Sequence, residues 1–271
     1  MLKRLEHSSV PESSGPEPGP QFEFRVTEAA RRLFGDVLGN SVTESAILNA
    51  VTDVVGLAEE SVEERKEAEP PGSPIACRAG CAYCCYSRAQ VTPPEVIFLA
   101  HFIRAKFSSS ELEGLKTRLK EADEITHGMT EEEHGESGVP CPLLVDNLCS
   151  AYDARPLECR GFVSMDVDAC RKALDHYAAW NVPVYFPQYS IFKNAQAGLV
   201  AALIGADYPF EVLELTAALR IALNSPDVAE RWLAGENVFQ AAALSPSDPD
   251  VLALQPWTPT FEPPTKERTL R

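Results

Sequence analysis

Hydrophobic residues recur every three or four positions along much of the chain, which is the spacing of one helical face. One such run precedes the charged sequence EERKEAE and consists of Ile47, Val51, Val54, Ala58 and Val62. Ser41 with Glu44 has the form of a capping box before it. The pattern predicts a long amphipathic helix, packed against a shorter one over residues 27–38.

Helix start signals continue beyond the proline-rich break PPGSP at 70–74. Thr92 before two prolines predicts the start of a helix that continues to about Ile103, and Ser110 with Glu113 predicts another that ends near Ile125. The acidic sequence from His127 to Gly138 is expected to be a flexible loop. Later apolar patterns predict further helices over 169–180, 189–204, 208–223 and 226–234.

No sustained alternation of apolar and polar residues indicates strands, and there are no repeats. The predicted fold is therefore mainly α, a helical protein around an irregular cysteine-rich centre with little or no β-sheet. The expected divisions are a disordered tail over 1–20, helices over 21–70, a cysteine-rich domain over 71–170, helices over 171–244 and a proline-rich tail over 245–271.

Composition narrows the classes of partner and compartment. The net charge is −16, and the 24 basic residues form no long run, so neither nucleic acid nor an anionic membrane is an expected partner. The N-terminus has no apolar signal region and no stretch is long enough to span a bilayer, so a cytoplasmic location is expected. Clustered cysteines in a reducing compartment indicate metal binding or redox chemistry more often than disulfides.

Four of the eight cysteines stand in CRAGCAYCC: Cys77, Cys81, Cys84 and Cys85. On one regular helix they would share a face about 100° wide, but the first and last would lie roughly 12 Å apart. Sulfurs that bind one tetrahedral zinc lie within about 4 Å of one another. The backbone must therefore break near Gly80, or the thiols hold several ions, or only some of them join ligands from elsewhere.

Further thiols downstream favour the last of these arrangements. Cys141, Cys149 and Cys159 lie in CPLLVDNLCSAYDARPLECR, and Cys170 follows. Pro142 and the pair Asp146 and Asn147 are turn signals, so this segment should form tight loops that can present thiolates.

The two cysteine motifs, in this order, resemble the CxxxCxxCC cysteine-cluster family, also called YkgJ-like zinc- or iron-chelating domain proteins. The resemblance covers about residues 77–162. Leu143, Asn147 and Ala151 replace residues more usual in the family, and Asn147 still suits the left-handed turn that Gly would provide. Cys170 lies outside the motifs and is the weakest candidate ligand.

The resemblance implies binding of zinc or iron by seven cysteines: Cys77, Cys81, Cys84, Cys85, Cys141, Cys149 and Cys159. It implies no known reaction for most members. Some larger relatives are associated with protein lysine methylation and an iron–sulfur cluster. An iron–sulfur enzyme or redox component that acts on a protein substrate is therefore the alternative, although the chain has no GxGxxG turn for a nucleotide-type cofactor.

Other side chains each allow a role at a metal site and an ordinary structural role. Arg155 and Arg160 could offset the charge of bound thiolates or form surface salt bridges. His127 and His134 could complete a site, but a solvated loop is the preferred interpretation. The expected partners are a metal ion and a protein that contacts the helical flanks. A third hypothesis, a thiol redox sensor that uses Cys84 and Cys85 without metal, ranks last.

Overall fold

The computed structural model describes residues 19–39, 42–176, 182–249 and 251. Most of the two predicted tails lies outside these residues, as does Ser41 of the predicted capping box. The α-helices are α1 (Gly19–Leu38), α2 (Glu44–Ala68), α3 (Pro93–Lys106), α4 (Ser109–Thr126), α5 (Glu131–Ser137), α6 (Leu157–Gly161), α7 (Val167–His176), α8 (Phe186–Gly205), α9 (Leu215–Asn224) and α10 (Val228–Leu233).

The remaining elements are short. The 3₁₀ turns are η1 (Tyr83–Tyr86), η2 (Tyr152–Ala154) and η4 (Gln240–Ala242), and the strands are β1 (Gln90–Val91), β2 (Leu144–Val145), β3 (Leu148–Cys149) and β4 (Leu213–Glu214). Both sheets of the described residues are antiparallel pairs, β1 with β4 and β2 with β3. The prediction of a mainly α-helical fold with little β-sheet is confirmed.

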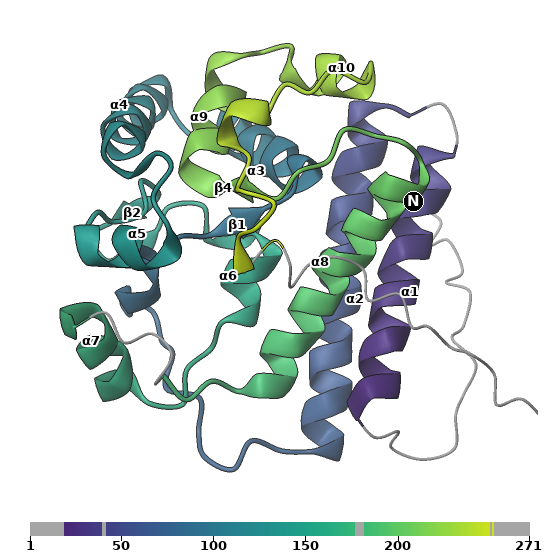
Figure 1. The fold of residues 1–271 in the computed structure, drawn as a ribbon. Helices are drawn as coiled ribbons and strands as arrows, with labels where there is room; N and C mark the ends of the chain where they lie inside the picture. The colour runs from purple at the N-terminus through teal and green to yellow at the C-terminus, as the bar shows by residue number, and fades with distance from the viewer. Residues whose placement is uncertain (1–18, 40–41, 177–181, 250, 252–271) are drawn as a thin grey trace, which may run out of the picture.

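Three long helices, α1, α2 and α8, pack side by side and form one layer of the molecule (Figure 1). The close approach of α1 and α8 depends on Gly198, because a Cβ there would clash with the Thr27 carbonyl oxygen and lie 2.8 Å from the Ala30 Cβ. Val54 and Ala58 of α2 and Phe22 of α1 are buried in this layer. The buried apolar stripe of α2 thus follows the spacing that predicted this helix.

The main hydrophobic core lies between α3, α9 and their neighbours. Leu99 and Ile103 of α3 and Leu219 of α9 are buried there, and Trp232 of α10 belongs to the same cluster. The β1–β4 pair joins this core through Val91 opposite Leu213. Residues on both sides of the cysteine-rich segment therefore share one core.

Local capping explains where most helices begin, and it corrects three predictions. Thr92 and Glu95 form the capping box of α3, as expected. The α4 capping box is Ser108 with Glu111 rather than Ser110 with Glu113. The predicted acidic loop is wrong over 131–137, which form α5 behind a capping box of Thr130 with Glu133.

The helix predicted over 208–223 also begins late. Residues 213–214 pair with β1 before α9 starts at Leu215, because Glu214 uses its side chain to cap the helix. Its carboxylate accepts the backbone N–H groups of Thr216 at 2.8 Å and Ala217 at 2.7 Å. The sheet pairing therefore overrides a start signal at Asp207 and Pro209.

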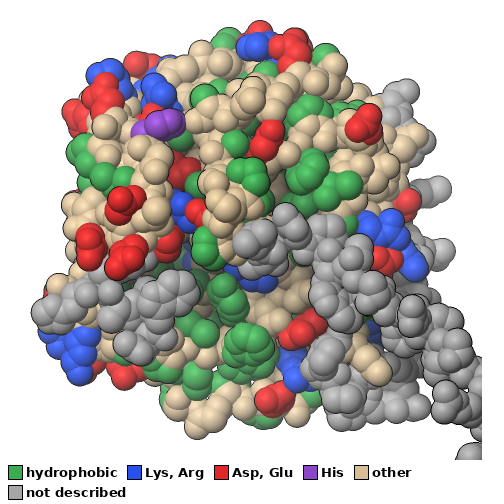
Figure 2. Space-filling view, viewed as in Figure 1, with side chains coloured by type: hydrophobic (Ala, Val, Ile, Leu, Met, Phe, Trp, Pro, Cys, Tyr) green, Lys and Arg blue, Asp and Glu red, His purple; other side chains and the backbone are tan. Residues whose placement is uncertain are grey.

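The surface carries charge of both signs. On the face shown in Figure 2, acidic side chains are spread widely, basic ones occur in small groups, and hydrophobic side chains gather around a hollow below the centre. Among the described helices, none combines the length and apolarity that crossing a bilayer requires.

Candidate metal centre

The four-cysteine motif is not a single helix. Cys77 lies in an irregular segment, Gly80 has a left-handed backbone with φ of 82°, and only Cys84 and Cys85 lie in the 3₁₀ turn η1. The backbone thus breaks near Gly80, where a residue without a Cβ adopts this conformation without strain. Cys77 and Cys84 are exposed, whereas Cys81 and Cys85 are partly buried.

The downstream cysteines sit on a hairpin and a short helix. Asp146 and Asn147, with φ of 50° and 61°, form the turn between β2 and β3, and Cys149 ends β3. The left-handed turn expected at Asn147 is therefore present, and Asp146 shares it. Cys159 lies in α6, which starts after the Arg155–Pro156 turn.

A backbone hydrogen bond joins the two halves of the centre. The N–H of Cys141 donates to the carbonyl of Cys85 at 2.7 Å, across 56 residues of sequence. On its other side, Arg118 of α4 donates from Nε to the Pro142 carbonyl at 2.9 Å. The structure thus brings Cys141 of the downstream motif next to Cys85 of the four-cysteine motif.

A backbone N–H group points at the sulfur of Cys77. The Ser164 N–H donates to Cys77 Sγ at 3.2 Å, and the backbone at Leu143 and at Ala151 lowers the pKa of Cys141 and Cys149 against the larger effect of burial. Hydrogen bonds of this kind stabilise a thiolate more than a thiol. They are the outer-shell support expected around sulfur ligands of a metal.

The cysteines fall into two groups of mutually interacting thiols. Burial raises the pKa of Cys77 and Cys170, and negative charge on Cys84 or Cys81 would raise both further. In the second group, burial raises the pKa of Cys141 to about 12 and also raises those of Cys149 and Cys159. Charge on Cys84 raises the pKa of each member of this second group as well.

Cys84 therefore lies between the two groups. A hydrogen bond with the Cys85 side chain raises its own pKa well above the usual value, and the protein atoms around its sulfur add to the shift although the residue is exposed. Like charges so close together cannot coexist without a compensating cation. This is the electrostatic setting in which a divalent metal displaces thiol protons.

The thiols are gathered but not in final coordination positions. Among the described residues, no three Cys, His, Asp or Glu side chains stand close enough to hold one ion as they are placed. Rotation between staggered side-chain conformations moves a cysteine sulfur without moving the backbone. The donor set fits zinc or iron in its chemistry, since both ions bind clustered thiolates.

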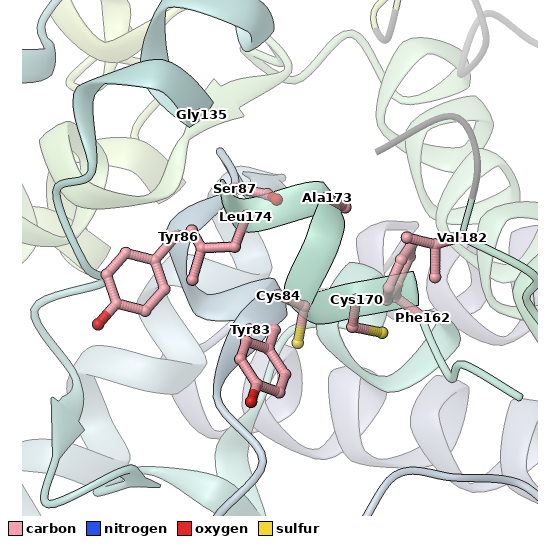
Figure 3. A pocket seen from close by; sticks show the side chains of 10 residues that line it. All are labelled: Tyr83, Cys84, Tyr86, Ser87, Gly135, Phe162, Cys170, Ala173, Leu174 and Val182. Atoms are coloured by element: carbon pink, nitrogen blue, oxygen red, sulfur yellow. The ribbon is translucent and has the colours of Figure 1, made fainter. Parts of the chain in front are cut away.

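Cys170 belongs with the four-cysteine motif in space. Its residue is 8% exposed, and α7 packs against η1. Cys170 and Cys84 line one pocket of about 40 Å³ with aromatic side chains of Tyr83, Tyr86 and Phe162 (Figure 3). From the sequence, Cys170 is the weakest candidate ligand because it follows the two motifs and no spacing signal links it to Cys77.

The two arginines near Cys159 have different roles. Arg155 lies over the Tyr152 ring, 3.6 Å from its centre, and its charge lowers the pKa of Cys77, Cys84 and Cys149 against the effect of burial. Arg160 instead binds Glu59 of α2 at 2.7 Å and the carbonyls of Asp153 and Arg155. Arg155 thus acts on the thiols through its charge, whereas Arg160 links their loop to α2.

Residues of the supposed acidic loop also reach the centre. His134 is 5% exposed, in contrast to the solvated loop that we preferred from sequence, while the His127 side chain is exposed and lies 3.1 Å from Asp123. Burial lowers the pKa of His134, and a hydrogen bond to the Tyr86 backbone opposes this shift. The capping box at Thr130 and Glu133 was the sequence signal that could have revealed this helix.

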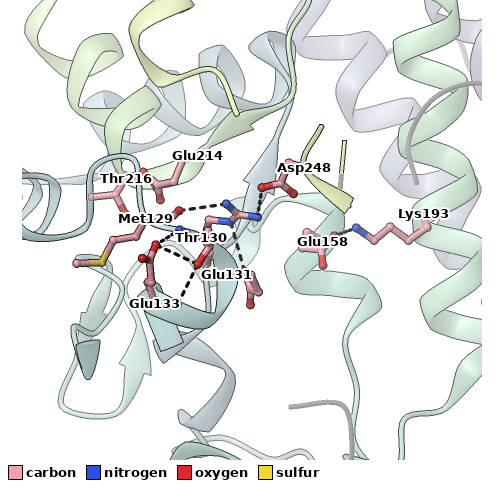
Figure 4. A network of polar contacts seen from close by, with 10 residues as sticks. Met129, Thr130, Glu131, Glu133, Glu158, Lys193, Glu214, Thr216 and Asp248 are labelled. Carbon is pink, nitrogen blue, oxygen red and sulfur yellow. Dashed lines mark hydrogen bonds and ion pairs between the residues drawn. The ribbon is translucent and has the colours of Figure 1, made fainter. Parts of the chain in front are cut away.

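A buried arginine anchors α5 and the C-terminal segment beside the thiols. Arg88, three residues after Cys85, pairs with Asp248 at 2.8 Å and Glu131 at 3.3 Å and donates to the Met129 carbonyl at 3.3 Å (Figure 4). Its side chain is 3% exposed. These contacts therefore hold the segment after the cysteine motif against both α5 and the C-terminal segment.

Comparison with known families places these features in context. Residues 76–177 match the model of a family described as CxxCxxCC, "Putative zinc- or iron-chelating domain". Neither the curated proteins nor the solved structures gave a match. The match contains all eight cysteines and supports metal binding by this part of the chain. Residues 76–177 therefore match the CxxCxxCC family model, in agreement with the resemblance that the two cysteine motifs indicated.

Proposed function

We propose that the cysteine-rich segment, residues 71–170, binds zinc or iron as its function. The proposed ligands come from the seven cysteines of the two motifs, with Cys170 as an eighth thiol of the same centre. The observation that carries this proposal is the Cys141–Cys85 backbone bond, because it brings thiols from both motifs together. Thiolate sites in proteins are suited to these metals.

The chain's own residues prepare the centre for a cation. The Ser164 N–H donates to the Cys77 sulfur, and the backbone at Leu143 and Ala151 favours the thiolate forms of Cys141 and Cys149. The Arg155 charge offsets part of the negative charge of Cys77. Loading would release the thiol protons to solvent, since the ligand is the thiolate. The bound metal would supply Lewis-acid or redox chemistry according to its identity.

The test is metal content of the full chain purified without oxygen. The wild type should retain zinc or iron, and Cys81→Ser and Cys141→Ser should each lower the amount per chain. An exposed residue such as Ser247, changed to Ala, serves as the matched control and should leave it unchanged. Full metal content in both cysteine variants would contradict the proposal.

An iron–sulfur cluster is the second candidate. Eight thiols exceed the four ligands of one tetrahedral ion, and both groups share Cys84. An ultraviolet–visible spectrum with an acid-labile sulfide assay separates the two candidates. Brown protein that contains sulfide supports a cluster, whereas colourless protein with zinc supports a thiolate site.

A further inference from the structure

A small cavity lies behind the second thiol group, between the end of α4, α5 and the start of α9. Its lining includes His134, Cys141 and Glu214, and it has room for about one water molecule. Three chemically different donors therefore face one enclosed space: a thiol, an imidazole and a carboxylate.

Only two of these donors are free to bind an added ligand. Both carboxylate oxygens of Glu214 already accept backbone N–H groups at the start of α9. His134 Nδ1 is buried and, among the described residues, has no hydrogen-bond partner. An unpaired buried nitrogen costs free energy, so its retention at this place requires an explanation.

The imidazole lies beside the cysteine motif itself. The Tyr86 backbone is close enough to the His134 ring to raise its pKa, against the lowering effect of burial. The adjacent carbonyl, that of Cys85, accepts the Cys141 N–H at 2.7 Å. The 3₁₀ turn η1 thus lies beside His134 and holds Cys141 next to Cys85, and His134 and Cys141 line the same cavity.

A metal-binding histidine offers one ring nitrogen to the ion while a neighbouring polar group orients the ring from its other side. The buried, unpartnered Nδ1 of His134, which shares a cavity with Cys141, suits this role. We propose that His134 Nδ1 is a ligand of the metal centre, on the side formed by Cys85 and Cys141. The inference rests on the proposed function and adds a nitrogen donor to a set that contains only sulfur.

The experiment loads the metal-free full chain with cobalt(II) or zinc(II) and measures X-ray absorption and metal affinity. The wild-type spectrum should contain scattering from an imidazole ring as well as sulfur. His134→Ala should remove the imidazole contribution and weaken binding at least about tenfold. His127→Ala is the matched control, because that exposed histidine pairs with Asp123, and it should change neither quantity.

A second variant keeps the test valid if His134→Ala does not fold. Changing the other four histidines, His7, His101, His127 and His176, to Gln leaves His134 as the single imidazole. The imidazole scattering should persist in this chain. Sulfur-only coordination in the wild type, or imidazole scattering that survives His134→Ala, would overturn the inference while leaving the metal centre in place. A wild type that binds no metal would overturn both.

Discussion

The Glu95 carboxylate accepts the backbone N–H of Leu157 at 2.9 Å. Glu95 lies in the first turn of α3, and Leu157 begins α6, two residues before Cys159. The other oxygen accepts the Thr92 N–H and hydroxyl and the Gln196 amide. One buried carboxylate, 3% exposed, therefore positions a candidate ligand and ties together three segments distant in sequence.

Replacing this carboxylate should destabilise the chain. Glu95→Gln exchanges one acceptor oxygen for an NH₂ group, so at least one buried donor loses its partner, at a cost of about 2–4 kcal/mol. Urea unfolding of the metal-free chain measures the change. Glu111→Gln is the control, since Glu111 has the same capping role in an exposed setting and should destabilise the chain much less. Equal losses would show that burial of Glu95 is not decisive.

The contact between α1 and α8 should not tolerate a methyl group. Gly198→Ala places a Cβ against Thr27 and Ala30 and is expected to cost about 1–3 kcal/mol through overpacking. Gly56→Ala in α2 meets no atom within 4 Å and should stabilise the chain by about 0.5–1 kcal/mol. Thermal unfolding of the two variants should shift in opposite directions, and a shift in the same direction would contradict the packing argument.

The metal-free chain should lose stability at alkaline pH. The folded pKa of Cys141 is about 12, against an ordinary value of about 9, so the folded state keeps a proton that the unfolded chain releases. The associated stability is fully present below about pH 9 and declines towards pH 12. Denaturant titrations between about pH 8 and 10.5 measure the decline.

The variant Cys141→Ala provides the comparison for this pH dependence. It should show a shallower decline, because one raised thiol pKa has been removed. Metal-loaded protein should also resist the change, since bound thiolates have already released their protons. Identical slopes in wild type and variant would mean that Cys141 is not the titrating group.

The Arg155 charge should strengthen metal binding. Arg155→Ala removes a cation that favours the thiolate forms of Cys77, Cys84 and Cys149, and affinity should fall about 3–10-fold. Competition with a chelator measures this. Arg155→Lys should retain part of the effect, whereas Arg171→Ala, which removes an exposed arginine of α7, should have none. Equal metal affinity in the wild type and Arg155→Ala would mean that Arg155 only packs on Tyr152.

Local signals predicted much of the helical framework. The apolar spacing of Val54 and Ala58 gave α2, and Thr92 with the following prolines gave α3, because these signals act within a few residues. Where such signals competed, sequence reasoning failed. The proline at 209 suggested a helix start, but pairing of Leu213 with Val91 delays it to residue 215, and that pairing joins segments over 120 residues apart.

The site was predictable in its members but not in its assembly. The cysteine spacing and the motif order indicated thiolate chemistry, yet nothing local shows that Cys141 binds the Cys85 carbonyl or that Cys170 lies near Cys84. His134 was assigned to solvent because a glutamate-rich sequence suggested exposure. Its burial depends on how α5 packs, which composition alone does not encode.

The pairing of β1 with β4 bears on how such a domain can be inherited. Gln90 and Val91 lie inside the family segment, whereas their partners Glu214 and Leu213 lie beyond it. The same holds for α3 against α9 and α6 against α8. In this chain the family segment is thus not a self-contained module, and a recombination event that moved residues 76–177 alone would expose the core that it shares with α8 and α9.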